Sequence, residues 1–145
     1  MASSTAKIVS KLILVGILSG IILIIPLKLL YEWLGNPAYI LLFNFDYIPV
    51  LNQLRPVQFF GYVFHFVTCV CSVIGLFYIL KVWNFEYKVN LYILVYMIGG
   101  GALFFLTALS PQLPQADDKI SWLYWTLAHG LFGLSVGFLI KKFIK

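Results

Sequence analysis

Four long stretches of the chain carry no formal charge, and short segments between them hold nearly all of the Lys and Arg residues. The uncharged stretches are Leu12–Leu27, Pro56–Leu80, Val89–Ala116 and Ile120–Ile140. An α-helix rises about 1.5 Å per residue, so about 20 apolar residues cross a hydrocarbon core of roughly 30 Å. Backbone groups without a hydrogen bond are not tolerated in lipid, which leaves helices as the spanning elements. The pattern therefore predicts an all-α fold, a four-helix transmembrane bundle.

The expected spans cover about residues 8–30, 57–81, 89–110 and 121–141, in a single integral membrane domain over residues 1–145. The composition agrees, since 62% of the residues are hydrophobic and 10% are charged, against about 25% charged residues in soluble domains. The link between the second and third spans is short. We therefore expect these two helices to be antiparallel neighbours.

The longest link joins the first two spans and contains an apolar run over residues 38–48. This run is too apolar for water and too short to cross the bilayer. We expect a short interfacial segment, which either lies in the outer interface or caps the bundle as a short helix. A lid or re-entrant segment over a site is the alternative.

The formal charge of +5 is concentrated at the ends of the spans. With a cytoplasmic N-terminus, seven cations fall on the inner side and three on the outer side, as the positive-inside rule requires. The inner cations are Lys7, Lys11, Lys81, Lys88, Lys141, Lys142 and Lys145, and the outer ones are Lys28, Arg55 and Lys119. The sequence thus predicts a multi-pass protein of the cell (inner) membrane with both termini cytoplasmic. The lipid bilayer is the expected partner and nucleic acid is not, because no folded basic face is visible.

Small residues recur at helical spacing in two of the spans. Gly16 and Gly20 form a G-x-x-x-G pair in the first span, and Gly133 and Gly137 form another in the fourth. Such pairs let membrane helices approach one another closely. Contact inside one bundle explains them; formation of a homo-oligomer, or packing against a larger membrane partner, is the alternative.

Three consecutive glycines, Gly99, Gly100 and Gly101, stand near the middle of the third span. Each weakens a helix by about 1 kcal/mol relative to Ala in soluble hosts. One interpretation is a very close approach of two backbones. The other is a broken or hinged helix that exposes its carbonyl groups to a cavity, as in transporters.

The two histidines, His65 and His129, each lie eight residues, or about 12 Å, from the expected outer end of a span. Ionisable residues inside a membrane indicate function by default. Three interpretations are open: each ring makes one interhelical hydrogen bond, His65 to Thr107 or Thr126; the pair senses or transfers protons; or the pair joins Cys69 in a metal site. The candidate pH-responsive or polar cluster is His65, His129, Cys69 and Thr107, with no metal assigned.

The run Gly133–Gly137 also matches, by its letters, the G-x-S-x-G nucleophile elbow of hydrolases. An elbow needs a strand, a sharp turn and a helix, whereas this run is expected in mid-helix. Ser135 and His129 are six residues apart and so fall on different helix faces. The sequence predicts no catalytic residue, no enzyme activity and no cofactor.

Two local motifs carry a family resemblance. The run Gly61–Phe66 and the triplet Ala128–Gly130, with Lys141 and Lys142 beyond it, resemble the YagU family of small bacterial inner-membrane proteins and are also similar to YqhR-type membrane proteins. Tyr62 and Cys71 depart from this family, which has histidine at both positions. The resemblance implies a link to acid tolerance and supplies no catalytic residue.

The sequence therefore favours a non-enzymatic integral membrane protein related to acid or envelope stress. A small transporter or channel, with a site in the outer half of the bundle, is the first alternative. A membrane interaction subunit is the second.

Overall fold

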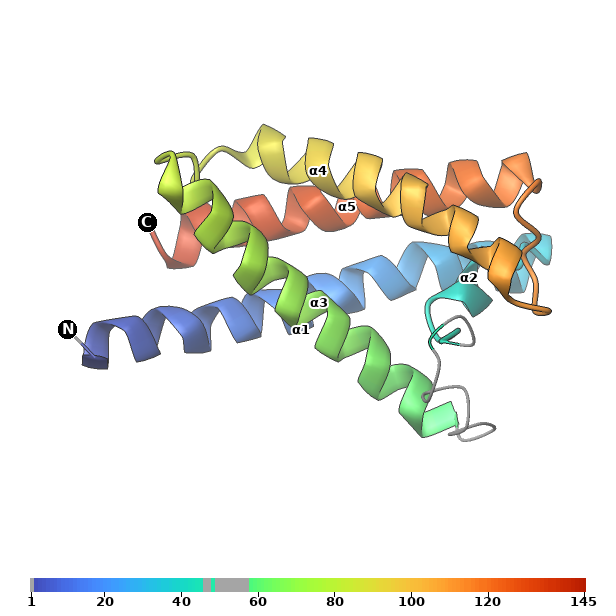
Figure 1. The fold of residues 1–145 in the computed structure, drawn as a ribbon, viewed down its shortest axis with the longest axis horizontal. Helices are drawn as coiled ribbons and strands as arrows, with labels where there is room; N and C mark the ends of the chain where they lie inside the picture. The colour runs from blue at the N-terminus through green and yellow to red at the C-terminus, as the bar shows by residue number, and fades with distance from the viewer. Residues whose placement is uncertain (1, 46–47, 49–57) are drawn as a thin grey trace.

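The computed structural model describes residues 2–45, 48 and 58–145, and these residues form an all-α fold (Figure 1). In chain order the elements are α1 (Ala2–Leu34), α2 (Ala38–Leu41), α3 (Gln58–Val82), α4 (Val89–Leu103), the 3-10 helix η2 (Phe104–Leu109) and α5 (Lys119–Phe143). The predicted four-helix arrangement, with a short helix between the first two spans, is confirmed. Asp46, Tyr47 and Arg55 lie outside the described residues.

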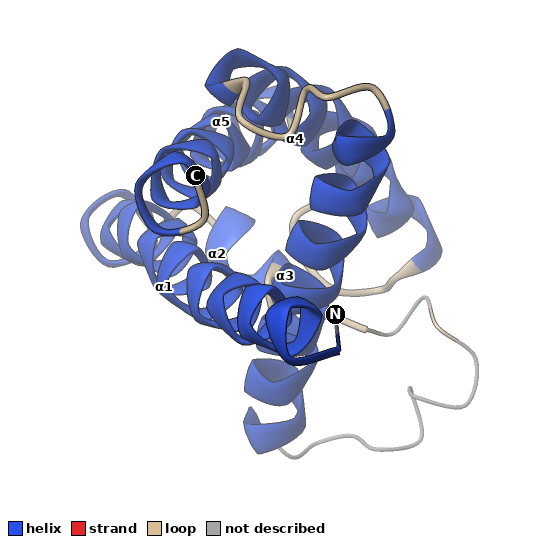
Figure 2. Cartoon of the chain, turned by 90° about the vertical axis from the view of Figure 1, so that its left-hand side faces the viewer, coloured by secondary structure: helices blue, strands red, loops and turns tan. Residues whose placement is uncertain are grey.

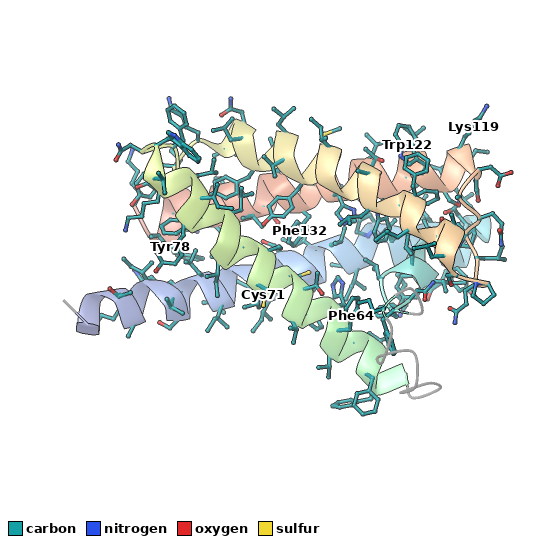
Figure 3. The ribbon with its side chains drawn as sticks, viewed as in Figure 1. Phe64, Cys71, Tyr78, Lys119, Trp122 and Phe132 are labelled. Atoms are coloured by element: carbon teal, nitrogen blue, oxygen red, sulfur yellow. The ribbon has the colours of Figure 1, made fainter. Side chains whose placement is uncertain are left out.

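Four helices are long and apolar enough to cross a membrane. They cover Thr5–Leu34, Phe59–Val82, Val89–Leu109 and Lys119–Phe143. Large apolar side chains project outward from all of them (Figure 3); Val67 is 54% exposed and Phe138 is 58% exposed. In water such a surface would drive aggregation, whereas in a bilayer it contacts lipid tails. The chain is therefore an integral, multi-pass membrane protein.

The packing order of the long helices differs from the chain order. α1 packs on both α3 and α5, and α4 packs on α5, whereas the backbones of α3 and α4 hardly approach one another (Figure 1). The second and third spans run in opposite directions from the turn that joins them, as predicted, but they diverge and do not pack closely as neighbours (Figure 1). Asn84, with φ 59°, ends α3 in a Schellman turn, closed by bonds from the N–H of Phe85 to the Leu80 carbonyl and from the N–H of Asn84 to the Lys81 carbonyl. The turn reverses the chain, but the glycine faces that allow the closest approach join other helix pairs.

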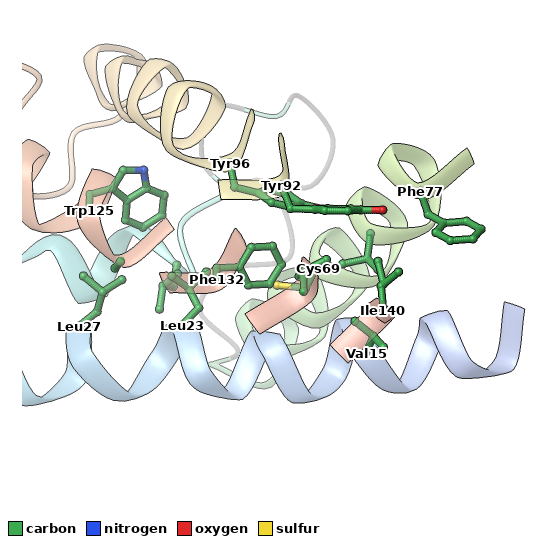
Figure 4. Close-up of a cluster of buried hydrophobic side chains, with 14 of the residues drawn as sticks. Val15, Leu23, Leu27, Cys69, Phe77, Tyr92, Tyr96, Trp125, Phe132 and Ile140 are labelled. Carbon is green, nitrogen blue, oxygen red and sulfur yellow. The ribbon is translucent and has the colours of Figure 1, made fainter. Parts of the chain in front are cut away.

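Buried side chains from all four long helices form one core (Figure 4). Val15 of α1 and Tyr92 of α4 are fully buried, and so is Ile140 of α5. The Tyr92 hydroxyl donates to the Glu86 carbonyl at 2.9 Å, so its burial leaves no unpaired donor. At one end of the bundle the Lys11 Nζ donates to the Phe143 carbonyl at 2.6 Å, and both chain ends lie at this end (Figure 1).

The short helix α2 caps the opposite end of the bundle. Figure 2 shows it across the far end of the ring formed by the long helices. Ala38, Leu41 and Leu42 are buried, and α2 packs on α1 and α5. The predicted short helix that caps the bundle is therefore present. Burial of these apolar side chains against α1 and α5 stabilises the capping position. A segment that only rested on the bilayer would leave part of this apolar surface at the membrane surface.

Two asparagines attach the cap to its neighbours. The Asn36 Nδ2 donates to the Ser121 hydroxyl at 3.0 Å, and the Asn44 Nδ2 donates to the Ser110 hydroxyl at 2.8 Å. Gly35, with φ 66°, ends α1 in a left-handed conformation, which directs the chain back toward the bundle. The cap is thereby bonded to the start of α5 and to the residue that follows η2.

Candidate functional site

A cavity of about 290 Å³ lies inside the bundle, beneath α2 and between α3 and α4. Five helices contribute to it. Its lining comprises Leu23, Leu41, Leu42, Phe64, His65, Thr68, Cys69, Ser72, Val95, Tyr96, Gly99, Gly100, Leu103, Trp125, His129 and Phe132. Three of the four residues of the predicted cluster, His65, Cys69 and His129, are therefore in one cavity, and Thr107 is not in its lining.

His65 of α3 is 4% exposed and is held by the backbone of α1. Its Nε2 lies 3.2 Å from the Gly20 carbonyl oxygen. A carbonyl only accepts, so Nε2 carries the hydrogen of the neutral ring and Nδ1 carries a lone pair. The Cys69 sulfur lies beside the ring, 3.8 Å from Nε2 and 4.0 Å from Nδ1, and only Nδ1 has a lone pair that a weak S–H donor could use. A Cβ at Gly20 would come within 3.3 Å of this sulfur, so glycine permits the close approach.

The expected bond from His65 to Thr107 or Thr126 is wrong. The hydroxyl oxygens of both threonines are buried and have no hydrogen-bond partner in the described part of the chain. The Gly20 carbonyl, one helix away, takes their place. Residue types alone could not predict this bond, because every residue carries a backbone carbonyl.

His129 of α5 is held by its own helix. Its Nδ1 lies 2.9 Å from the Trp125 carbonyl oxygen. By the same reasoning Nδ1 carries the hydrogen and Nε2 a lone pair. No described residue is a partner of that Nε2. The ring packs against the Trp125 indole at a tilt, with centroids 4.4 Å apart and an interplanar angle of 43°.

Gly100 provides the space for the His129 ring, since a Cβ at Gly100 would overlap its Cγ. The Trp125 Nε1 also donates to the Gly100 carbonyl, at 2.8 Å. The neighbouring Gly101 lies against Thr126, where a Cβ would stand 3.1 Å from the hydroxyl oxygen. Gly99 lines the cavity, and a Cβ there would have no atom within 4 Å.

α4 runs unbroken through Gly99, Gly100 and Gly101 to Leu103 and continues as the 3-10 helix η2 from Phe104, so the helix is not broken at the glycines themselves. α5 does approach closely at Gly100 and Gly101, but with the side chains of His129 and Thr126 and not with its backbone, so the predicted close approach of two backbones is not found there.

A pair of hydroxyl groups bridges the separation between α3 and α4. The Tyr96 hydroxyl of α4 donates to the Ser72 hydroxyl of α3 at 3.4 Å, and Ser72 in turn donates to the Cys69 carbonyl at 2.9 Å. The sequence analysis missed Tyr96, Ser72 and Trp125. Trp125 precedes His129 by one helical turn, which could have placed it on the same face, but the pairing of Tyr96 with Ser72 depends on the packing of two helices.

The other predicted glycines lie at helix interfaces. A Cβ at Gly16 would stand 2.8 Å from the Val70 Cα of α3. Gly133 and Gly137 face the first turn of α4, where a Cβ at Gly137 would stand 2.9 Å from the Val89 Cα. Ser135, between them, lies within α5 and donates to the Phe132 carbonyl at 2.8 Å. It faces a separate apolar groove beside Pro26 and not the cavity.

Among the described residues, no group of three His, Cys, Asp or Glu side chains is arranged to hold a metal ion. No Asp, Glu, Lys or Arg is among the described residues that line the cavity. The site is thus an aromatic and apolar chamber with two neutral imidazoles. No family model, curated protein or solved structure matches the chain.

Proposed function

We propose that the protein is a non-enzymatic membrane protein whose His65/His129 cavity responds to acidification of the outer side of the membrane. One observation carries the proposal: the two histidines of the chain, on α3 and α5, line the same cavity inside the bundle. Isolated structural histidines have no reason to share a chamber. The acid tolerance that the YagU resemblance implies agrees with the proposal, and the resemblance itself stays a prediction.

Protonation changes the bonding of each ring. The lone pair at His65 Nδ1 or His129 Nε2 is replaced by an N–H donor that has no oxygen or nitrogen acceptor among the described residues, and each ring gains a positive charge. The other titratable groups of the cavity lining are Cys69 and Tyr96, and no described lining residue is a carboxylate that could balance the charge. Two like charges in one apolar chamber repel and attract water. Since the backbones of α3 and α4 hardly touch, separation of these helices is the expected response.

The proposed topology places both termini in the cytoplasm of an inner membrane. Seven of the ten Lys and Arg residues belong to the end that holds both termini in this assignment, which the positive-inside rule favours. The α2 cap then lies on the outer side, and the cavity beneath it faces the external pH. Tags at either terminus should be inaccessible to a membrane-impermeant label in intact cells; labelling of a tag from outside would reverse the topology.

The fluorescence of Trp125 tests the pH response. A protonated imidazole quenches an indole that it contacts, and the Trp125 and His129 rings are in contact, with centroids 4.4 Å apart. In a variant with Trp33, Trp83 and Trp122 changed to Phe, acidification from about pH 8 to about pH 4 should quench the remaining Trp125. His129→Gln should abolish the quenching, whereas the control Ser135→Ala, on the same helix but outside the cavity, should keep it.

A cellular assay addresses the role of the response. Cells that carry the His65→Gln/His129→Gln double variant should survive acid challenge less well than cells with the wild-type protein. Equal survival, with no change in Trp125 fluorescence on acidification, would contradict the proposal.

A small transporter or channel is the second candidate. The open space at Gly99 inside the cavity favours it. Flux across proteoliposomes, absent from liposomes without protein, tests this candidate. Assembly with a larger membrane partner stays a prediction.

A further inference from the structure

We propose that the cavity binds a neutral, membrane-soluble molecule that carries an aromatic hydroxyl group, of the phenol or hydroquinone class, and that His129 Nε2 accepts the hydrogen bond from this hydroxyl. The proposal names the ligand class of the cavity and rests on its proposed function. It follows from an inventory of the polar atoms around the chamber.

Nearly every polar hydrogen of the lining is already donated to the protein. The hydrogens of both imidazoles are directed to backbone carbonyls, and so is the Trp125 N–H. The Tyr96 and Ser72 hydroxyls donate in series and end on the Cys69 carbonyl. Only the Cys69 thiol, which is a weak donor beside His65, and Thr68, on the exposed rim, are left.

Lone pairs are what the lining offers to a ligand. The His129 Nε2 has no partner among the described residues, and the His65 Nδ1 has only the sulfur at 4.0 Å. A site with free acceptors and few free donors selects a ligand that donates. An ether or a ketone of the same shape finds only the Thr68 hydroxyl at the rim and the weak Cys69 thiol as donors.

The charge of the lining selects a neutral ligand. No Asp, Glu, Lys or Arg is among the described lining residues, so an anion or a cation would enter without a counter-ion. A cation could in principle use aromatic faces. However, the tilted His129 ring already packs against Trp125, and Phe132 stands edge-to-face with Tyr96 at 4.7 Å. The aromatic groups therefore do not form an open cage.

The shape and position of the cavity select a small ring that arrives through the membrane. Its 290 Å³ is at the low end of the roughly 300–1,000 Å³ of small-molecule sites. Phe64, Tyr96, Trp125 and Phe132 supply the aromatic walls. A single aromatic ring with a short alkyl chain fits such a volume.

A matched pair of probes tests the donor requirement. 4-Butylphenol and 4-butylanisole have nearly the same shape, but only the phenol has an O–H. Their binding to the protein in nanodiscs, corrected by partition into empty nanodiscs, should favour the phenol by about 3- to 10-fold, as one hydrogen bond allows. Equal affinities, or tighter binding of butylammonium than of the phenol, would overturn the proposal.

A variant and a pH change locate the acceptor. His129→Leu should reduce phenol affinity to that of the ether and leave the ether unchanged, whereas Ser135→Ala should change neither. With the wild-type protein, acidification to about pH 4 should remove the preference in the same way, because a protonated ring has no lone pair. A preference that survives both changes contradicts the role of His129. The wild-type probe pair needs no variant, so a folding defect in His129→Leu cannot hide a failure.

The same samples separate this inference from the pH response. If the phenol shows no preference while Trp125 is still quenched by acid, the ligand class is wrong and the pH response stands. If the preference is present but Trp125 does not respond to pH, the cavity is a binding site without the proposed response.

Discussion

The contact between α4 and α5 and the separation between α3 and α4 are opposite solutions to the packing of membrane helices. In the first, Gly100, Gly133 and Gly137 allow backbone or ring atoms to touch the facing helix directly. In the second, two hydroxyl groups span a distance that the backbones do not close. Lipid tails are as apolar as Leu, so close packing and polar contacts decide where helices meet. The tight interface fixes one wall of the cavity, and the loose one leaves room for a site.

Filling the tight interface should have the largest effect. A Cβ at Gly133 would overlap the backbone of Tyr92, which cannot move as a side chain can. Gly133→Ala should therefore lower the free energy of unfolding by about 1–3 kcal/mol or more, as overpacking does. Gly75→Ala is the matched control, because a Cβ there meets no atom within 4 Å. Unfolding in detergent, followed by circular dichroism, measures both; equal stability of the two variants would refute the tight contact.

Two neighbouring glycines that line the cavity, Gly99 and Gly100, allow a matched pair of substitutions. Gly100→Ala should displace the His129 ring and weaken the Trp125 quenching at low pH, at a cost of about 1–3 kcal/mol in stability. Gly99→Ala should leave the quenching intact, because its Cβ enters open space. It should also stabilise the helix by up to about 1 kcal/mol. The same loss of quenching in both variants would argue against the position of the ring.

The cap should be less sensitive than the glycine contacts. Asn36→Ala removes the hydrogen bond to Ser121 that attaches the segment before α2 to α5, and also the bond that the Asn36 Oδ1 accepts from the N–H of Ala38. The expected loss is about 0.5–1.5 kcal/mol for each hydrogen bond, and hydrogen exchange at Leu41 and Leu42 should become faster. Asn90→Ala, at an exposed position on α4, is the control. If the exchange rates of the two variants agree, the bond does not hold the cap.

Hydropathy was sufficient for the architecture and not for the site. The four spans and the short helix follow from apolar length alone, because the bilayer permits few alternatives. The shared cavity of His65 and His129 agrees with their equal distance from the span ends. The error about α3 and α4 has a different origin. Loop length limits how far two helix ends can separate, but it does not fix which faces pack.

The partners of the histidines could not be read from the sequence either. Both rings bond to backbone carbonyls, which residue types do not encode. Thr107 has the right chemistry for a partner, yet its hydroxyl is buried with no partner in the part of the chain that the structure describes. To pair each donor with its acceptor, one must know how each helix is rotated relative to its neighbours. The hydrophobic pattern does not determine this rotation.

The smallest effect is expected at the exposed start of α5, where Asp118 is the N-cap. Its side chain accepts from the N–H of Ser121 at 3.0 Å and from the Ser121 hydroxyl at 2.6 Å. These bonds hold the pKa of the Asp118 carboxyl below its ordinary value, since they favour the charged form. Asp118→Ala should reduce the stability near neutral pH by about 1 kcal/mol, as the loss of a cap does.

The pH dependence gives the sign of this contribution. A lowered pKa in the folded state means that the stabilisation by Asp118 is complete above the ordinary carboxyl pKa and is lost as the pH falls through the folded value. The difference in melting temperature between wild type and Asp118→Ala should therefore shrink below about pH 4. The neighbouring Asp117→Ala, which removes no cap, should show no such change. Acid-induced quenching of Trp125 should be the same in both variants, because the cap and the cavity titrate independently; a common transition would mean that the start of α5 transmits the external pH to the cavity.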